Sequence, residues 1–200
     1  MKITDLNMPA WMRKMDSVSV DPADSVVYGY ETPNAGCFVL ARAVPLEHSL
    51  VSAGKQAIID GLHRTLHDDQ GLIEVEEGKT AAGRRYLYSV VKTLKQPAGV
   101  QYTLILDLDD ADGPAMVHGT FDEQGTTGFR DSMVFAMLSN GGKVEVTEDG
   151  IKGWNADPYD PEYLKGSLMN RSETREYDTV FPLHPLSVLR QFVTELVELN

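Results

Sequence analysis

The sequence predicts an α+β fold: an antiparallel β-sheet flanked by helices, an α/β/α sandwich, followed by a C-terminal extension that ends in a helix. Three runs of strand length, 84–94, 99–109 and 115–122, are apolar or alternate in polarity. Turn residues separate these runs, as a meandering antiparallel sheet requires. Two other segments, 49–67 and 186–199, repeat apolar residues at the spacing of an amphipathic helix.

Two strands, 25–30 and 36–44, open the predicted sheet and are joined by a loop of turn-forming residues. A helix follows them. It begins at Ser49 or Ser52, either of which could cap it, and ends near His67. The apolar side chains of this helix fall on one stripe, which must pack on a sheet. The stripe comprises Val51, Ile58, Ile59, Leu62 and Leu66.

The central meander supplies most of the predicted core. A short strand, 72–77, precedes it. Strand 84–94 is apolar on both sides, so we expect it near the middle of the sheet with cover on each face. A short helix, 129–140, follows the meander, and glycines at its end give a stop signal. We predict that its apolar stripe packs on the sheet. That stripe comprises Phe129, Met133, Ala136 and Met137.

Composition changes after Asn140, so we divide the chain into a domain, 1–140, and an extension, 141–200, packed on the domain or on a partner. The extension is long and poor in aliphatic residues until its last helix, which starts after Pro185. The helix has an apolar seam, through which a homodimer contact is one prediction. The seam comprises Leu186, Leu189, Val193 and Leu196.

The chain is acidic, with a formal net charge of −12 from 30 acids and 18 bases. Its field repels phosphate backbones and anionic lipids, so we expect neither nucleic acid nor membrane as a partner. No window is apolar enough for a membrane span, and the single cysteine, Cys37, fits a reducing compartment. These observations predict a soluble protein of the cytoplasm.

Three local patterns imitate ligand sites, and each lacks a required part. Residues 78–80 read Gly-Lys-Thr, but Ile73 stands where a phosphate-binding loop needs glycine. The acidic turn 107–113 has the wrong register for a calcium loop. His63 and His67 have a metal-compatible spacing but no evident third ligand, so we interpret them as an exposed helix end. We therefore predict no cofactor and no metal.

No local signature of catalysis is present either. The sequence has no nucleophile elbow, and Cys37 lies between apolar neighbours, where it is expected to pack as a small hydrophobe. Residues 154–163 concentrate aromatic, acidic and proline residues in a predicted loop, which either folds back on the domain or presents anchors to another protein. The candidate partner-binding residues are Trp154, Tyr159, Tyr163, Arg171, Arg175 and Tyr177.

The order of elements and the phrases SVVYGYE, CFVLARAVPLEHS and EEGKTAAGRRYLYSVV resemble the PsbP-like superfamily over residues 18–140. That superfamily includes an oxygen-evolving photosystem II subunit, a Ran-binding import factor and bacterial effector chaperones. The resemblance implies an antiparallel sheet with helices on both sides and a role in binding proteins rather than in catalysis. It implies no functional residue, and the extension after Asn140 departs from the pattern.

We therefore predict a non-enzymatic protein-binding or adaptor module of unknown partner, in contact with it through the sheet face or the extension. The alternative is a small hydrolase or small-ligand-binding enzyme whose site residues are dispersed in the sequence. An enzyme requires a pocket with converging titratable groups, whereas a binding module presents an apolar surface.

Overall fold

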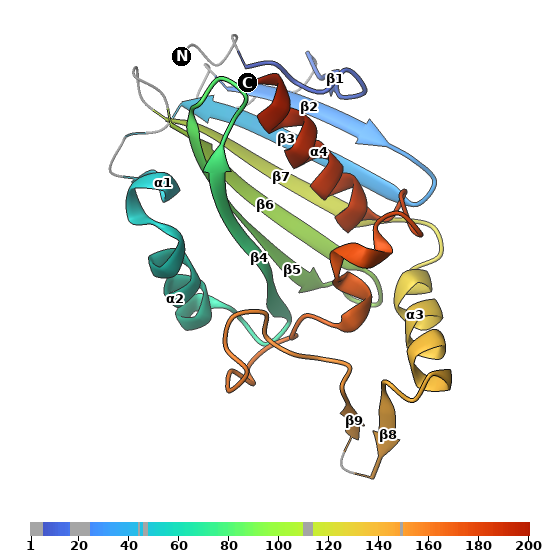
Figure 1. Cartoon of the computed structure of the whole chain (residues 1–200). Coiled ribbons are helices and arrows are strands. Elements are labelled where there is room, and N and C mark those ends of the chain that lie inside the picture. The colour runs from blue at the N-terminus through green and yellow to red at the C-terminus, as the bar shows by residue number, and fades with distance from the viewer. Residues whose placement is uncertain (1–5, 17–24, 44, 46–47, 110–113, 149) are drawn as a thin grey trace.

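The fold is built on a seven-stranded antiparallel sheet with the strand order β1-β2-β3-β7-β6-β5-β4 (Figure 1). A computed structural model describes residues 6–16, 25–43, 45, 48–109, 114–148 and 150–200. The α+β class and the antiparallel sheet predicted from the sequence are confirmed. The strands are β1 (Arg13–Lys14), β2 (Val26–Glu31), β3 (Ala35–Ala43), β4 (Gln70–Lys79), β5 (Arg85–Leu94), β6 (Val100–Leu108) and β7 (Ala115–Glu123).

Helices lie on both faces of this sheet, and a small hairpin extends away from it (Figure 1). The predicted helix 49–67 is broken at Gly54, whose φ of 82° ends one helix and starts the next. No helix in the described parts of the chain is long and apolar enough to cross a membrane. The remaining elements are α1 (Leu50–Ala53), α2 (Lys55–Thr65), α3 (Phe129–Asn140), β8 (Glu145–Thr147), β9 (Gly150–Lys152), η3 (Arg171–Glu173), η4 (Arg175–Tyr177) and α4 (Pro185–Leu199).

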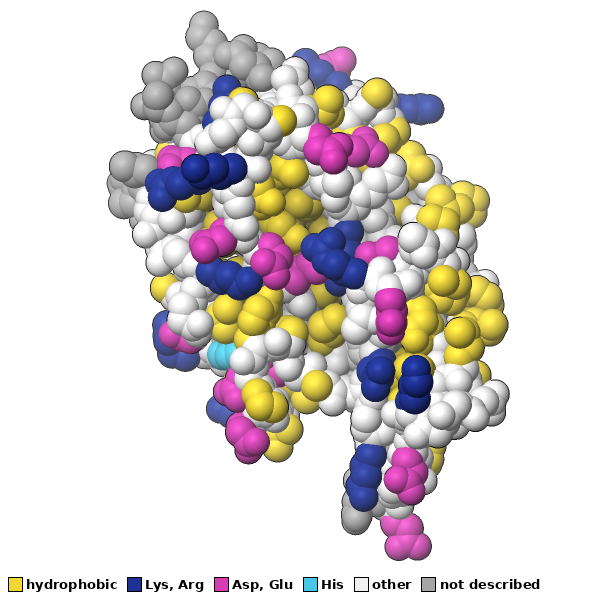
Figure 2. Space-filling view, in the orientation of Figure 1, with side chains coloured by type: hydrophobic (Ala, Val, Ile, Leu, Met, Phe, Trp, Pro, Cys, Tyr) yellow, Lys and Arg dark blue, Asp and Glu magenta, His cyan; other side chains and the backbone are white. Residues whose placement is uncertain are grey.

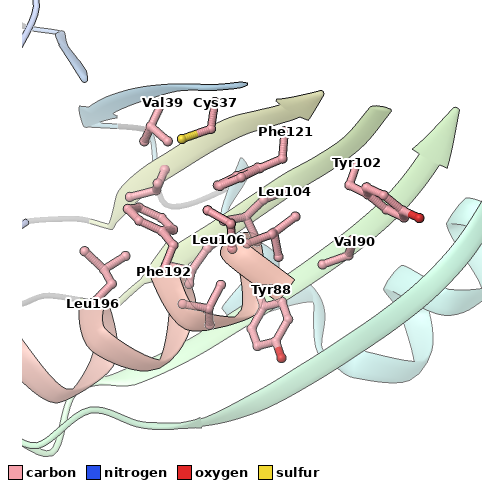
Figure 3. Close-up of a cluster of buried hydrophobic side chains, with 14 of the residues drawn as sticks. Cys37, Val39, Tyr88, Val90, Tyr102, Leu104, Leu106, Phe121, Phe192 and Leu196 are labelled. Atoms are coloured by element: carbon pink, nitrogen blue, oxygen red, sulfur yellow. The ribbon is translucent and has the colours of Figure 1, made fainter. Parts of the chain in front are cut away.

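The main core lies between α4 and one face of the sheet. Phe192 of α4 meets Phe121 of β7 with ring centroids 5.9 Å apart, and Leu104 and Leu106 of β6 lie beside them (Figure 3). The whole predicted seam of α4 is buried in this core. The apolar seam through which a homodimer contact is predicted is therefore covered within the chain.

The other face of the sheet is covered over β4 to β6 by α1 and α2. Ile59 of α2 packs against Val75 of β4 and Leu87 of β5. The amide of Leu50 donates a 2.6 Å hydrogen bond to Asp107 of β6, which fixes the start of α1. Strand β5 thus has cover on both faces, as its sequence predicts. The predicted place near the middle of the sheet is wrong, because β5 lies next to the edge strand β4. The acidic turn at 110–113 lies outside the described residues.

Helix α3 differs from the prediction, because its apolar stripe does not face the sheet. Its buried residues are Arg130, Val134 and Leu138, which turn toward η3 and the segment after β8. The predicted stripe is exposed instead: Phe129 is 54 %, Met133 45 % and Met137 56 % accessible to solvent. The physical reason is Arg130, whose hydrogen-bond acceptors all lie in the extension and draw the opposite side of the helix inward.

The extension is joined to the sheet by a buried polar network as well as by α4. Nζ of Lys92 on β5 donates a 2.7 Å hydrogen bond to Glu173 of η3, and the Tyr102 hydroxyl donates to the same carboxylate at 2.9 Å. Arg190 of α4 pairs with Glu74 of β4 at 3.0 Å. Extension and sheet therefore share one apolar core and one ionic network.

Candidate protein-binding surface

Helix α3, which the structure describes in full, presents an uncharged face to solvent. Phe129, Met133 and Met137 follow one another at intervals of four residues, so they lie on one side of the helix over about 12 Å. None of the exposed side chains of α3 is charged, although 24 % of the chain consists of charged residues. We call this surface the α3 face; it comprises Phe129, Ser132, Met133, Ala136, Met137 and Asn140.

Arg130 holds α3 in this orientation. Its Nε donates to the carbonyl of Ser172 at 2.7 Å and its Nη1 to the hydroxyl of Ser187 at 2.8 Å. Its Nη2 donates to the carbonyl of Thr174 at 3.2 Å and to Asp178 at 3.1 Å. Because a guanidinium with this many partners fixes one geometry, the helix cannot rotate its apolar face toward the body without breaking these bonds.

Apolar contacts secure the rest of the buried side of α3. Val134 and Leu138 form a small core with Val144 and Tyr177, and the Phe135 ring meets Trp154 edge to face at 5.2 Å. The buried side of α3 is therefore fully used by the extension. Its exposed side has no such cover among the described residues. Figure 2 shows yellow side chains gathered along the right-hand side of the molecule, over this helix.

A cavity of about 480 Å³ adjoins the α3 face between the β7–α3 connection and the segment that precedes α4. Phe129 belongs to both, so the two features form one continuous surface; its ring meets that of Phe181 at 6.1 Å. We call this cavity the β7–α3 pocket. Its lining comprises Asn34, Glu123, Gln124, Thr126, Phe129, Arg130, Val180, Phe181, Pro182, Leu183 and His184.

His184 is the most perturbed titratable group in the pocket. Its Nδ1 accepts a 3.3 Å hydrogen bond from the amide of Leu186 as the cap of α4, so the ring proton is assigned to Nε2. Burial, together with the charges of Arg130 and Arg190, lowers the pKa of His184 to about 3. The imidazole is therefore neutral at physiological pH and offers its Nε2–H as a donor.

Glu123 lies opposite this donor. Its Oε1 accepts a 2.8 Å hydrogen bond from the amide of Gly128, and the same oxygen is 4.0 Å from Nε2 of His184. That distance is too long for a direct hydrogen bond. Burial raises the pKa of Glu123 above its ordinary value, as does the charge of Asp131, while the Gly128 and Val100 amides oppose the rise. A donor and an acceptor thus stand apart in a pocket whose remaining lining is partly apolar and partly polar.

No protein-family model matches the sequence, and no curated protein matches it. The chain is similar in structure to PsbP-like proteins. The cyanobacterial PsbP, CyanoP, from Synechocystis sp. PCC 6803 is 17 % identical, with a TM-score of 0.38, over 66 % of this chain and 79 % of that one. The Saccharomyces cerevisiae Ran-binding protein Mog1p is 11 % identical, with a TM-score of 0.35, over 66 % and 75 %. The predicted resemblance is thus confirmed as a likeness of fold at low identity.

Two of the predicted partner-binding aromatics fold back toward α2 and β4. The Tyr159 hydroxyl bonds both the amide and the carbonyl of Val75, at 2.5 and 3.0 Å, on the outer edge of β4. Tyr163 donates to the carbonyl of His63 at 3.0 Å and stacks on its ring. His63 also lies 3.0 Å from Asp157 and is largely buried, so the exposed helix end expected for it is wrong.

The other predicted partner-binding residues lie near α3 and the ionic network. Trp154 and Tyr177 pack beneath α3, and the amide of Arg171 donates to the carbonyl of Trp154 at 2.9 Å. Arg175 forms an ion pair with Glu74 at 3.1 Å. Its side chain is more than half exposed, whereas that of Glu74 is buried. The tyrosines are thus engaged within the chain, and partner binding by this group stays a prediction.

A second depression, of about 850 Å³, lies at the ends of β2 and β3. It is lined in part by Trp11, Phe38 and Cys37, with charged residues at its rim. Burial raises the pKa of the Cys37 thiol to about 12, so it stays protonated and is no nucleophile. Cys37 packs in the core, where its sequence places it.

Proposed function

We propose that this protein is a protein-binding module and that the α3 face, extended by the β7–α3 pocket, is its contact surface. The observation that carries the proposal is a helix with apolar side chains on both sides, one of which points outward. The helix is held there by Arg130, a buried residue with five polar partners. Helices of globular proteins normally turn such a stripe inward, so an outward stripe that is fixed in place indicates a partner.

The residue types on this surface suit protein recognition. Aromatic residues and methionine are enriched in the centres of protein interfaces, and charged residues are depleted there. Met133 and Met137 have flexible, polarisable side chains that adapt to a partner's shape. Val180 and Leu183, both exposed, extend the apolar area beside Phe129. The net charge of −12 favours approach by a partner that is basic around its own apolar contact.

The alternative, an enzyme with dispersed site residues, is less well supported by this pocket. Glu123 and His184 converge there, as catalytic residues do. A general base, however, works best when its pKa lies near the operating pH, and the pKa of His184 is lowered to about 3. The Nδ1 of the same ring is already used to cap α4. The pair is better placed to bind a polar group than to move a proton.

Site-specific photocrosslinking tests the proposal. A photoreactive amino acid replaces Met133 in one variant and Ala57, which is exposed on α2, in the control, and each protein is illuminated in its native cells. We expect a discrete protein adduct from position 133, identified by mass spectrometry, and none from position 57. The adduct is expected to disappear when Met137 is also changed to Glu. Adducts from position 57 alone contradict the proposal.

A further inference from the structure

We propose that the β7–α3 pocket receives a tyrosine side chain of the bound protein, with the phenol hydroxyl between His184 and Glu123. This inference rests on the proposed function and names the chemistry of the partner's anchor. It is carried by the 4.0 Å spacing of one buried donor and one buried acceptor in a pocket whose remaining lining combines apolar side chains with Asn34, Gln124, Thr126 and Arg130.

The gap between the two polar groups fits one hydroxyl oxygen. His184 Nε2 and Glu123 Oε1 are 4.0 Å apart, and an oxygen about 2.8 Å from each can lie between them. A phenol accepts from the Nε2–H and donates to the carboxylate, so one atom satisfies both groups. The carboxylate oxygen has room for this second bond, because Gly128 uses only one of its acceptor sites.

Because His184 and Glu123 are buried, the binding free energy depends strongly on whether the ligand pairs with both groups. The His184 side chain is 9 % exposed and the Glu123 side chain 5 % exposed, so a ligand that enters the pocket removes most of the water left to them. An unpaired donor or acceptor that loses its water destabilises the complex. A phenylalanine in the pocket leaves the Nε2–H without an acceptor and gives Glu123 no donor beyond the Gly128 amide, and a tryptophan, which only donates, leaves the Nε2–H without an acceptor.

The charges around the pocket favour a neutral anchor. Arg130 lines the pocket and its charge opposes a lysine or arginine side chain, and because its donors already have partners within the chain it offers little to a carboxylate, which Glu123 repels. The apolar part of the lining favours a ring; it comprises Phe129, Val180, Phe181, Pro182 and Leu183. Aromatic pairs gain from edge-to-face contacts of the kind that Phe129 and Phe181 already make.

The test uses two small probes that differ by one oxygen atom, N-acetyl-tyrosinamide and N-acetyl-phenylalaninamide. Each is titrated into the isotope-labelled full chain, and chemical-shift changes of residues 123–130 and 180–184 are followed. We expect the tyrosine probe to bind with a dissociation constant on the order of 1 mM, as ligands of this size do. We expect the phenylalanine probe to bind about tenfold more weakly, since it lacks one pair of hydrogen bonds.

Two variants test whether Glu123 and His184 cause the preference for the tyrosine probe. Glu123→Met removes the acceptor and keeps the shape, and His184→Asn removes the Nε2–H and keeps a cap for α4. Each is expected to abolish the preference for the tyrosine probe, whereas Gln56→Glu on α2 leaves it intact; thermal unfolding verifies the fold of each. Equal binding of the two probes to the wild type, or no binding of either, overturns the inference. The crosslinking result at position 133 is independent of these probes, so the proposed function can stand if the tyrosine pocket fails.

Discussion

The ion pair between Lys92 and Glu173 provides a quantitative test of how the extension is attached to the sheet. The two side chains are 4 % and 1 % exposed, and their N–O distance is 2.7 Å. Lys92→Met leaves the carboxylate buried without its counter-charge, which typically costs about 3–5 kcal/mol. Glu173 still accepts hydrogen bonds from the Tyr102 hydroxyl and the Asn170 amide, so we expect the lower end of that range, about 3 kcal/mol.

The assay is equilibrium urea unfolding of four proteins: the wild type, Lys92→Met, Glu173→Gln and the double variant. In a parallel thermal unfolding experiment, the same loss of about 3 kcal/mol corresponds to a fall in Tm of about 6–12 °C for a chain of this size. The double variant is expected to be at least about 1 kcal/mol more stable than the sum of the single effects predicts, because the two residues share one interaction. A Lys92→Met effect within about 0.5 kcal/mol, as for a surface residue, refutes the reasoning.

Three further predictions concern single side chains. The pKa of His184 is lowered to about 3 in the folded chain. The unfolded chain therefore binds one more proton than the folded chain below pH about 6.5. As the pH is lowered from about 6.5 to about 3, the free energy of unfolding decreases by up to about 1.4 kcal/mol per pH unit. His184→Asn should flatten that slope in urea titrations at several pH values; an unchanged slope contradicts the assignment. Cys37, whose pKa is raised to about 12, is expected to react with iodoacetamide at pH 8 far more slowly in the native protein than in urea. Equal rates would show that the thiol is not buried. Tyr159→Phe removes both hydrogen bonds to the edge of β4 and should cost about 1–2 kcal/mol and speed hydrogen exchange of the Val75 amide. Unchanged exchange at Val75 contradicts this role.

Local patterns in the sequence predict the sheet and the helices well, because alternation and helical spacing are properties of neighbouring residues. The strands of the meander and α4 lie where these patterns place them. The orientation of α3 could not be found in this way. The pattern shows that Phe129, Met133 and Met137 share a side, but not which side the fold buries. Arg130, which interrupts the helical pattern between Phe129 and Val134, was the available signal, since a buried guanidinium requires acceptors, and the extension supplies them.

The candidate site depends on contacts between residues that are far apart in the chain. Glu123 ends β7 and His184 caps α4, and neither position has a local mark of a pocket. The aromatic residues of 154–163 gave a stronger local signal, yet Tyr159 covers the edge of β4 and Tyr163 stacks on His63. Which aromatic groups serve the fold and which serve a partner is decided by tertiary hydrogen bonds, which the sequence alone does not display.

The most direct test of the central claim is the affinity of the crosslinked partner for a variant with a charge on the α3 face. Met133→Glu places a carboxylate in the middle of that face, and Gln56→Glu places one on exposed α2 as the control. Both sites are exposed, so thermal unfolding is expected to stay close to that of the wild type. We predict that Met133→Glu weakens binding at least about thirtyfold, the loss typical of an interface hot spot, and that Gln56→Glu binds like the wild type. A Met133→Glu protein that is folded and binds its partner with wild-type affinity contradicts the claim.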